Sequence, residues 1–239
     1  MDDWDRHVQF EACFNFRDLG GYHTIDGHEV RRRALYRSDS LHRLSAHDLE
    51  ALTALGIRAV VDLRTTSEVT ETGRVADHAE RVFKHIPCED PLDDYLLPRA
   101  ELYLAFAQAR GPQLAEAFDF AAHEDGPIVF HCMAGKDRTG ILAALLLATL
   151  GVPDATIAAD YALTERRLPS LLAWATEHDP ELAAWLAQVA PTGMLDTPAD
   201  AMLEFLSKLR SEYGTVDDYI AGAGVEVQTT EMIRARYLI

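Results

Sequence analysis

The chain has 239 residues, 48% of them hydrophobic and 26% charged, as is typical of a soluble globular protein. Its formal net charge of −17 argues against nucleic acid or an anionic membrane as a partner. Three scattered cysteines exclude a disulfide framework and fit a reducing compartment. The start of the chain is acidic rather than apolar, and the longest apolar run, residues 140–150, is too short to span a bilayer. We therefore expect a cytoplasmic protein without stable membrane insertion.

The first quarter of the chain alternates turn, strand and helix signals. Gly20–Gly21 is typical of a turn, Asp26–Gly27 of a hairpin tip, and residues 34–38 of the returning strand. Ser45 has the place and chemistry of a helix N-cap. The apolar residues 57–63 then predict a buried parallel strand.

Helix signals dominate the segment that follows. Thr65 with Glu68 three positions later is a capping-box pattern, and residues 82–87 predict one more strand. Residues 99–109 and 113–123 predict two helices separated by a Gly-Pro pair. The helix over 99–109 has Leu and Tyr positions that we expect to be exposed. Our hypothesis is therefore a lid that shields the nucleophile from water and oxidants, and an ordinary packing helix is the alternative.

The segment 128–140, IVFHCMAGKDRTG, has the sequence of a strand, a tight loop and a helix. The predicted strand ends directly before Cys132, and the apolar helix begins directly after Thr139. In such an arrangement the loop amides and the first turn of the helix point toward an anion. A thiol at the mouth of this cradle is expected to ionise readily, and Arg138 can bind two phosphate oxygens at once.

These parts suit phosphoryl transfer to cysteine. The Cys132 thiolate would attack phosphorus while the amides of residues 133–138 and the Arg138 guanidinium hold the other oxygens. The Thr139 hydroxyl would hydrogen-bond the sulfur when it leaves. A nucleotide-binding loop is excluded, because Asp137 rather than Ser or Thr follows the lysine. An inert buried cysteine at the end of a core strand is the structural alternative.

Residues 131–140, HCMAGKDRTG, resemble the signature of the cysteine-dependent protein-tyrosine phosphatase superfamily: His-Cys, five residues, Arg, then Ser or Thr. This version is similar to the bacterial atypical branch, which acts on phosphotyrosine, phosphoserine/threonine and phosphoinositides. Segments 15–22, 34–38 and 160–165 and the end of the chain also resemble that branch, so the resemblance covers nearly the whole chain. Residues 132–138 are called the signature loop below.

The resemblance implies a role for each residue of this loop. Cys132 would be the nucleophile and Arg138 the phosphate clamp. The phosphate-binding residues would be Met133, Ala134, Gly135, Lys136, Asp137, Arg138 and Thr139. The general acid is either Asp137, inside the loop, or Asp90, which occupies the usual place of the acid after a strand. Asp93 and Asp94 are second choices.

Asp62 and Arg64 end the strand predicted over 57–63 and would lie at the same sheet edge as Cys132. They either line the site or form an ion pair that fixes the strand to its loop, and the resemblance favours the site. We expect His131 to orient the loop by hydrogen bonding its backbone. The ten histidines contain no chelating pair, so we expect no metal and no cofactor.

After Gly151 the pattern is almost wholly helical. Breakers separate helices predicted over 153–166, 169–178, 180–190, 198–213, 215–222 and 229–237. The predicted fold is therefore α/β, with a central, mostly parallel sheet of about four or five strands flanked by helices and a largely helical C-terminal half. We expect one domain over 1–239, with a catalytic core over about 14–166 and a helical extension over about 167–239.

The expected activity is hydrolysis of phosphate monoesters, above all phosphotyrosine on proteins with broad specificity, through a phosphocysteine intermediate. A phosphoinositide substrate is the alternative, because Lys136 could meet a second phosphate, but Met133 stands where tensin-type lipid phosphatases carry another lysine. A non-catalytic phosphate-recognition module and sulfur transfer by a rhodanese-like loop also remain open. The sequence leaves the oligomeric state open.

Overall fold

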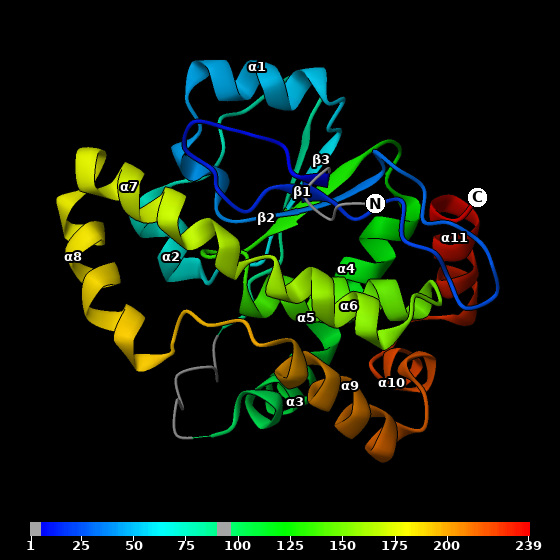
Figure 1. The fold of residues 1–239 in the computed structure, drawn as a ribbon. Coiled ribbons are helices and arrows are strands. Elements are labelled where there is room, and N and C mark those ends of the chain that lie inside the picture. Colours follow the sequence, from blue (N-terminus) through cyan, green and yellow to red (C-terminus); the bar gives the residue numbers. More distant parts are fainter. Residues whose placement is uncertain (1–5, 90–96) are drawn as a thin grey trace.

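The computed structural model describes residues 6–89 and 97–239. Within them, a five-stranded sheet in the order β1-β2-β5-β3-β4 forms the centre of the fold (Figure 1). The strands are β1 (Arg17–Asp18), β2 (Leu35–Ser38), β3 (Ala59–Asp62), β4 (Val82–His85) and β5 (Ile128–His131). β1 pairs antiparallel with β2, and the other three pairings are parallel. The predicted α/β class with a mostly parallel sheet is confirmed.

Helices take up most of the remaining chain. They are α1 (Ala46–Ala54), α2 (Thr66–Thr72), α3 (Arg99–Ala109), α4 (Gly111–His123), α5 (Asp137–Thr149), α6 (Asp154–Ala162), α7 (Leu168–His178), α8 (Pro180–Val189), α9 (Ala199–Tyr213), α10 (Val216–Gly222) and α11 (Val227–Tyr237). Two of them begin at the caps that the sequence predicts. The side chains of Ser45 and Thr65 accept hydrogen bonds from the amides of Asp48 and Glu68, and both caps form complete capping boxes.

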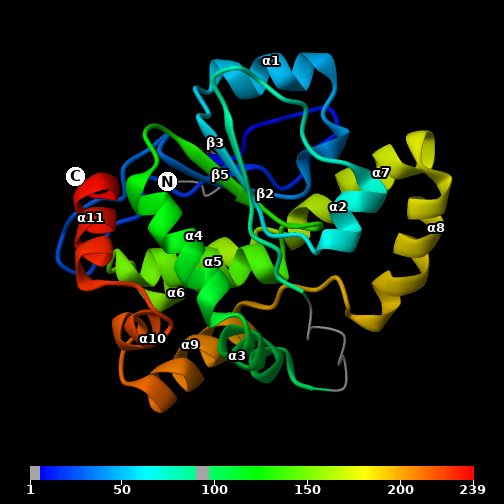
Figure 2. The same ribbon diagram turned by 180° about the vertical axis from the view of Figure 1, so that it is seen from behind.

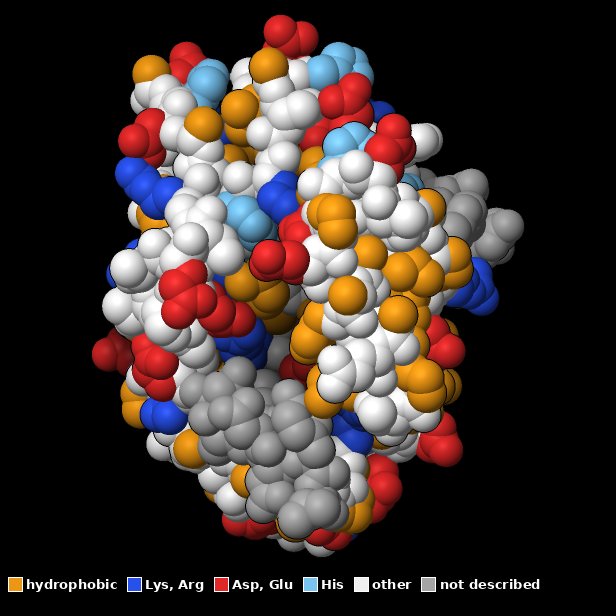
Figure 3. Space-filling view, turned by 90° about the vertical axis from the view of Figure 1, so that its left-hand side faces the viewer, with side chains coloured by type: hydrophobic (Ala, Val, Ile, Leu, Met, Phe, Trp, Pro, Cys, Tyr) orange, Lys and Arg blue, Asp and Glu red, His pale blue; other side chains and the backbone are white. Residues whose placement is uncertain are grey.

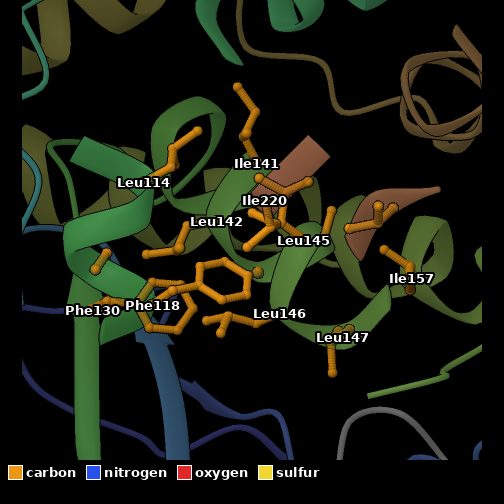
Figure 4. Packing of buried hydrophobic residues seen from close by; sticks show 14 of the residues in the cluster. Leu114, Phe118, Phe130, Ile141, Leu142, Leu145, Leu146, Leu147, Ile157 and Ile220 are labelled. Carbon is orange, nitrogen blue, oxygen red and sulfur yellow. The ribbon is translucent and has the colours of Figure 1, made fainter. Parts of the chain in front are cut away.

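The central strand β5 is buried on both faces, which explains its unbroken apolar run. Val129 belongs to one hydrophobic cluster, whereas Phe130 belongs to another, larger one. Helix α1 lies on one side of the sheet, and α4 and α5 lie on the other (Figures 1 and 2). In that larger cluster Phe130 lies beside Phe118 of α4, with Leu142 and Leu146 of α5 close by (Figure 4). Helix α5 is therefore held firmly at the place where the signature loop enters it.

The C-terminal half is helical, as predicted, and much of it joins the same core. Helix α9 packs on α3 and α6, α11 packs on α4, and α10 packs on α9 and α5. Phe205, Ile220 and Ile233 of these helices share the large cluster with Phe130. This shared core supports the proposal that one domain spans the chain. Among the described residues, no helix has both the length and the hydrophobicity needed to cross a membrane.

Some predicted boundaries and one predicted role differ from the structure. The strands predicted over 57–63 and 82–87 are shorter, and the helix predicted over 153–166 ends at Ala162 before a short 3-10 turn. The lid hypothesis for 99–109 is wrong in its premise that this helix exposes Leu and Tyr side chains. Leu102 and Tyr103 are buried, and α3 packs against α9 and α5, so it is a packing helix.

Candidate active site

Cys132 follows β5 directly and lies at the level where three parallel strands end. His131, the last residue of β5, is in register with Ser38 on β2 and with Asp62 on β3. The Cys132 side chain is buried within the core cluster, at 2% exposure. Ligands bind at the carboxyl ends of strands in sheets of this kind. The thiol therefore lies at the sheet edge that the strand order favours for a site.

The carbonyl groups at the start of the signature loop point away from the inner side of the loop and accept hydrogen bonds there. The Met133 carbonyl accepts the Ser40 amide at 3.0 Å. The Cys132 carbonyl lies 3.1 Å from Nδ1 of His131. The contact that we expected between His131 and the loop backbone is thus present, and its effect on the thiol stays a prediction.

Two buried side chains from the N-terminal segment bind the next carbonyls. Nδ2 of Asn15 donates to the carbonyls of Ala134 and Gly135 at 3.2 and 3.0 Å. Arg37 on β2 donates to the same Gly135 carbonyl at 2.9 Å. The sequence did not single out Asn15 or Arg37, although both lie in segments that resemble the phosphatase family.

The outward carbonyls determine where the loop amides point. In a trans peptide the N–H of the next residue lies opposite the C=O. The amides of residues 133–136 therefore point to the inner side of the loop, away from Ser40, Asn15 and Arg37. Helix α5 begins directly afterwards, and no side chain of residues 6–89 or 97–239 caps its N-terminus. The loop thus has the arrangement of an anion cradle.

Gly135 is required by this packing. Its φ of +64° is a conformation that L side chains rarely adopt. A Cβ atom at this position would come within 2.4 Å of the Ser38 carbonyl oxygen and 2.6 Å of the Asp39 amide. Only glycine lets the loop lie this close to the end of β2.

Arg138, the predicted clamp, is oriented by a carboxylate that the sequence analysis assigned only to a helix cap. Its NH1 and NH2 groups bind Oε2 and Oε1 of Glu68 on α2 at 2.6 and 2.8 Å. Burial acts to raise the pKa of Glu68, but the bonds from Arg138 hold it below its ordinary value. Glu68 also receives the Thr65 amide at 2.6 Å, so the N-terminal turn of α2 fixes the guanidinium.

Asp137 is the first residue of α5, and its side chain is 28% exposed. Its Oδ1 atom accepts a hydrogen bond from the Tyr103 hydroxyl and lies 3.4 Å from NH1 of Arg99 and 3.5 Å from Nζ of Lys136. Asp90, the other predicted acid, lies outside the described residues, as do Asp93 and Asp94. The described residues thus place one candidate acid beside the loop.

Lys136 does not present its ammonium group to the solvent. Nζ donates to the Met194 carbonyl, and the side chain is 8% exposed. Burial lowers the pKa of Lys136, while the neighbouring Asp137 acts to raise it. Met194 lies in the segment that connects α8 to α9. Arg99 binds the same segment, because its NH2 group donates to the Gly193 carbonyl at 3.0 Å.

Asp62 and Arg64 form a buried ion pair. Their side chains are fully buried and lie 2.6 Å apart, and Arg64 also donates to Thr72 Oγ1 and to the Gly73 carbonyl at 2.7 and 2.9 Å. Arg64 therefore connects β3 to the end of α2, which is the structural alternative that the sequence left open. Nε2 of His131 lies 3.8 Å from the Asp62 carboxylate, so this pair also supports β5.

Thr139 is fully buried in the first turn of α5. Within the described part of the chain, its hydroxyl oxygen has no hydrogen-bond partner, and no bond to the Cys132 sulfur is present. Buried hydroxyl groups are ordinarily paired. The hydrogen bond to a leaving sulfur stays a prediction, and the unpaired hydroxyl is consistent with it.

A buried cluster of charges links the N-terminal segment to α6 behind the loop. Asp160 binds Arg17 at 3.0 Å and Arg37 at 2.7 Å, and it accepts the Tyr22 hydroxyl at 3.1 Å. Because Arg37 also holds the Gly135 carbonyl, this cluster sets the position of the signature loop. The segments around these residues resemble the phosphatase family, but spacing alone does not predict that they meet.

Asp160→Asn should destabilise the protein by about 3–5 kcal/mol at neutral pH, because it leaves two buried arginines without their carboxylate. Burial acts to raise the pKa of Asp160, but Arg17 and Arg37 lower it from 3.8 to about 2. The stability that Asp160 contributes is therefore present above its unfolded pKa and is lost as pH falls through the folded value. Urea unfolding between pH 7 and pH 2 measures both effects.

Asp217→Asn is the matched control, because Asp217 pairs with Arg234 at 44% exposure. We expect it to change the free energy of unfolding by about 0.5 kcal/mol or less. If Asp160→Asn and Asp217→Asn lowered the free energy of unfolding by the same amount, the buried cluster would not have the stabilising role assigned to it.

A pocket of about 70 Å³ opens beside the signature loop. It is lined by Phe14, Asn15, Asp39, Arg43, Met133, Ala134, Lys136, Thr164, Glu165, Arg167, Leu168, Leu171 and Leu195. The Phe14 ring packs against Trp174 with a centroid distance of 5.9 Å. Figure 3 shows the side of the molecule that carries α2, α7 and α8. This face is hollowed, with basic side chains inside the hollow and hydrophobic ones gathered on one wall.

One group of possible metal-binding side chains occurs among the described residues, away from the loop. Atoms of Glu11, His47 and Asp48 lie within 4.8 Å of one another. The Asp48 carboxylate already accepts the amides of Glu11 and Ala12 at 2.7 and 3.1 Å and completes the cap of α1. This group is explained by helix capping.

Residues 8–239 match the model of the tyrosine phosphatase family. The chain belongs to this family. A relative from Cupriavidus necator that is named a tyrosine-protein phosphatase is 31% identical to this chain, and the match covers 98% of this chain and 89% of the relative. A tyrosine-protein phosphatase of Nostoc commune is 30% identical over 85% of this chain and 74% of its own length. The triple specificity protein phosphatase PtpB of Mycobacterium tuberculosis is 27% identical, over 95% of this chain and 97% of its own length.

The resemblance drawn from the signature loop is therefore confirmed. The phosphatase is a cysteine-dependent hydrolase of phosphate monoesters. Its fold carries the Cys132 thiol, the inward amides and the Arg138 guanidinium on one continuous strand–loop–helix unit.

Proposed function

We propose that this phosphatase hydrolyses phosphotyrosine on proteins, with tolerance for other phosphate monoesters, through a phosphocysteine at Cys132. The observation that carries the proposal is the signature loop itself. Its carbonyls are bonded outward, so its amides face inward between the thiol at one end and the guanidinium at the other. A dianionic phosphate fits such a cradle, and a neutral ester does not require one.

In the first step, the Cys132 thiolate attacks phosphorus and forms the S–P bond while the bond to the leaving oxygen breaks. Asp137 supplies the proton that the leaving oxygen takes up. In the second step, water attacks phosphorus, gives a proton to the Asp137 carboxylate, and the S–P bond breaks to restore the thiolate. The loop amides and Arg138 hold the equatorial oxygens in both steps.

The pocket beside the loop supports an aryl ester. Phe14 provides an aromatic face, and Leu168, Leu171 and Leu195 provide apolar walls next to Met133. Transfer of a phenyl ring from water to such an apolar surface is favourable and stabilises the bound ester. Arg43 and Arg167 also line the pocket, and they would favour acidic residues beside the phosphotyrosine.

The phosphoinositide alternative finds less support in the site. It depends on Lys136 meeting a second phosphate, but that ammonium group is buried against the Met194 carbonyl and the Asp137 carboxylate. A second phosphate would have to displace both partners. The resemblance to the bacterial branch implies phosphoinositide substrates, so lipid substrates belong in the test as a second panel.

The test is turnover of a ³²P-labelled phosphotyrosine peptide, quenched with detergent at alkaline pH and followed by peptide mapping at that pH. We expect label that is stable in base and labile in acid on the peptide that contains Cys132, as for an S–P bond, and phosphotyrosine peptides should turn over faster than phosphoserine peptides or phosphoinositide vesicles. Turnover with the label on another residue would contradict the phosphocysteine. Faster turnover of the vesicles would reverse the substrate preference.

A further inference from the structure

The Asp137 carboxylate is held on one side only. Its three contacts, from the Tyr103 hydroxyl, Arg99 and Lys136, all go to the same oxygen, Oδ1. Both hydrogen bonds that described side chains donate to this carboxylate, from Tyr103 and Arg99, go to Oδ1 rather than to Oδ2. This asymmetry matters because a carboxylic acid donates its proton from one particular oxygen.

The Tyr103 hydroxyl is itself part of a short chain of phenols. It lies 2.6 Å from the hydroxyl of Tyr161 on α6. Burial, together with the nearby Asp137 charge, raises the pKa of both tyrosines, so both carry their protons at neutral pH. A hydroxyl has one proton to donate. Tyr103 donates its proton to Asp137, and Tyr161 therefore donates to Tyr103.

The rings that carry these hydroxyls have little room to move. Tyr103 is fully buried, and its ring meets those of Tyr161 and Phe205 edge-on at centroid distances of 6.0 Å. Gly140 of α5 allows Tyr161 to come this close, because a Cβ atom there would lie 3.1 Å from the Tyr161 ring. The core of the protein thus fixes the donor that binds Asp137.

We propose that Tyr103 is a positioning residue that holds Asp137 by Oδ1 and confines its acidic proton to Oδ2. Oδ1 faces one hydroxyl donor and two cations, so a proton on that oxygen would point at groups that can only donate in this arrangement. Oδ2 then exchanges the proton with the leaving oxygen and with water. The inference rests on the proposed function, in which Asp137 is the general acid.

The test compares Tyr103→Phe with the wild type on two aryl phosphates. Phenyl phosphate has a poor leaving group that needs a proton, whereas 4-nitrophenyl phosphate has a good one. We measure kcat/KM, because it reports the first step, in which the leaving oxygen takes up its proton. We expect kcat/KM for phenyl phosphate to fall by about tenfold, which is part of the roughly 10²–10⁴-fold effect of a general acid. For 4-nitrophenyl phosphate we expect kcat/KM to change by about twofold or less.

Tyr219→Phe is the matched control. Tyr219 is buried too, and its hydroxyl donates to the Ala107 carbonyl on α3 at 2.7 Å, without a contact to Asp137. Tyr219→Phe therefore removes a buried hydrogen bond of a phenol from α10 to α3 and leaves the surroundings of Asp137 intact. The ratio of the two kcat/KM values should stay as in the wild type. Equal ratios in the two tyrosine variants would overturn the inference.

A double-mutant cycle separates positioning from a general effect on the fold. In the Asp137→Asn background, Tyr103→Phe should leave the ratio of the two kcat/KM values unchanged, because the acid is already absent. A further change of the same size in that background would overturn the inference. An unchanged ratio in Asp137→Asn itself would also overturn it, by removing Asp137 as the acid. The phosphocysteine label would still test the proposed function independently.

Discussion

Cys132→Ser is expected to hydrolyse aryl phosphates roughly 10⁴- to 10⁶-fold more slowly than the wild type. Serine occupies nearly the same volume at this buried position, so the fold and the phosphate cradle should remain. Its hydroxyl, unlike a thiol, hardly ionises near neutral pH and has no general base among its hydrogen-bond partners in the described part of the chain. Release of 4-nitrophenol, with circular dichroism to check folding, measures the loss.

Cys88→Ala is the control for this substitution. Cys88 is a fully buried cysteine in the same core cluster as Cys132. It should lower the free energy of unfolding modestly and leave kcat within about twofold of the wild type. Retention of turnover in Cys132→Ser would contradict the covalent mechanism, whatever the effect of Cys88→Ala.

Arg138→Lys is expected to lower kcat/KM by roughly 10²- to 10³-fold, the range seen when one donor to a transition-state oxyanion is removed. Lysine keeps the positive charge but cannot bind two phosphate oxygens in one plane. It also loses the paired bonds to Glu68 at 2.6 and 2.8 Å that orient the guanidinium. Steady-state kinetics with phenyl phosphate measures the effect.

Arg234→Lys serves as the control, because Arg234 is an exposed arginine at 41% that pairs with Asp217. We expect no change in kcat/KM beyond about twofold. If Arg138→Lys behaved in the same way, charge alone would account for phosphate binding, and the planar fork would have no special role.

Local sequence signals predicted much of the scaffold. The apolar run before Cys132 became β5, and Ser45 and Thr65 cap helices as their patterns indicated. These features depend on residues within a few positions of one another, so one sequence contains all the information they need. Boundaries were less accurate, since the strand over 82–87 ends at His85. The Ile86 amide still donates to the Asp62 carbonyl at 2.9 Å, but Pro87 has no N–H with which to continue the ladder.

Contacts between distant segments were not predicted. The sequence predicted only a helix-capping role for Glu68. It did not predict the bonds between Glu68 and Arg138, which are 70 positions apart in the chain. Asn15 reaches the Gly135 carbonyl across 120 positions. Several carboxylates and amides in this acidic chain could have filled these roles, and no spacing rule distinguishes them.

The sequence by itself determined that a thiol, a glycine-containing loop and an arginine stand between a buried strand and an apolar helix. That order follows from local backbone preference and hydrophobic periodicity, and it is enough to indicate the chemistry of phosphate esters. Only the tertiary structure decided that Glu68 orients Arg138, that Lys136 is turned away from solvent, and that Tyr103 holds Asp137. The physical reason is that side-chain partners depend on how β3, α3 and α8–α9 pack around β5, and packing joins residues that the chain keeps far apart.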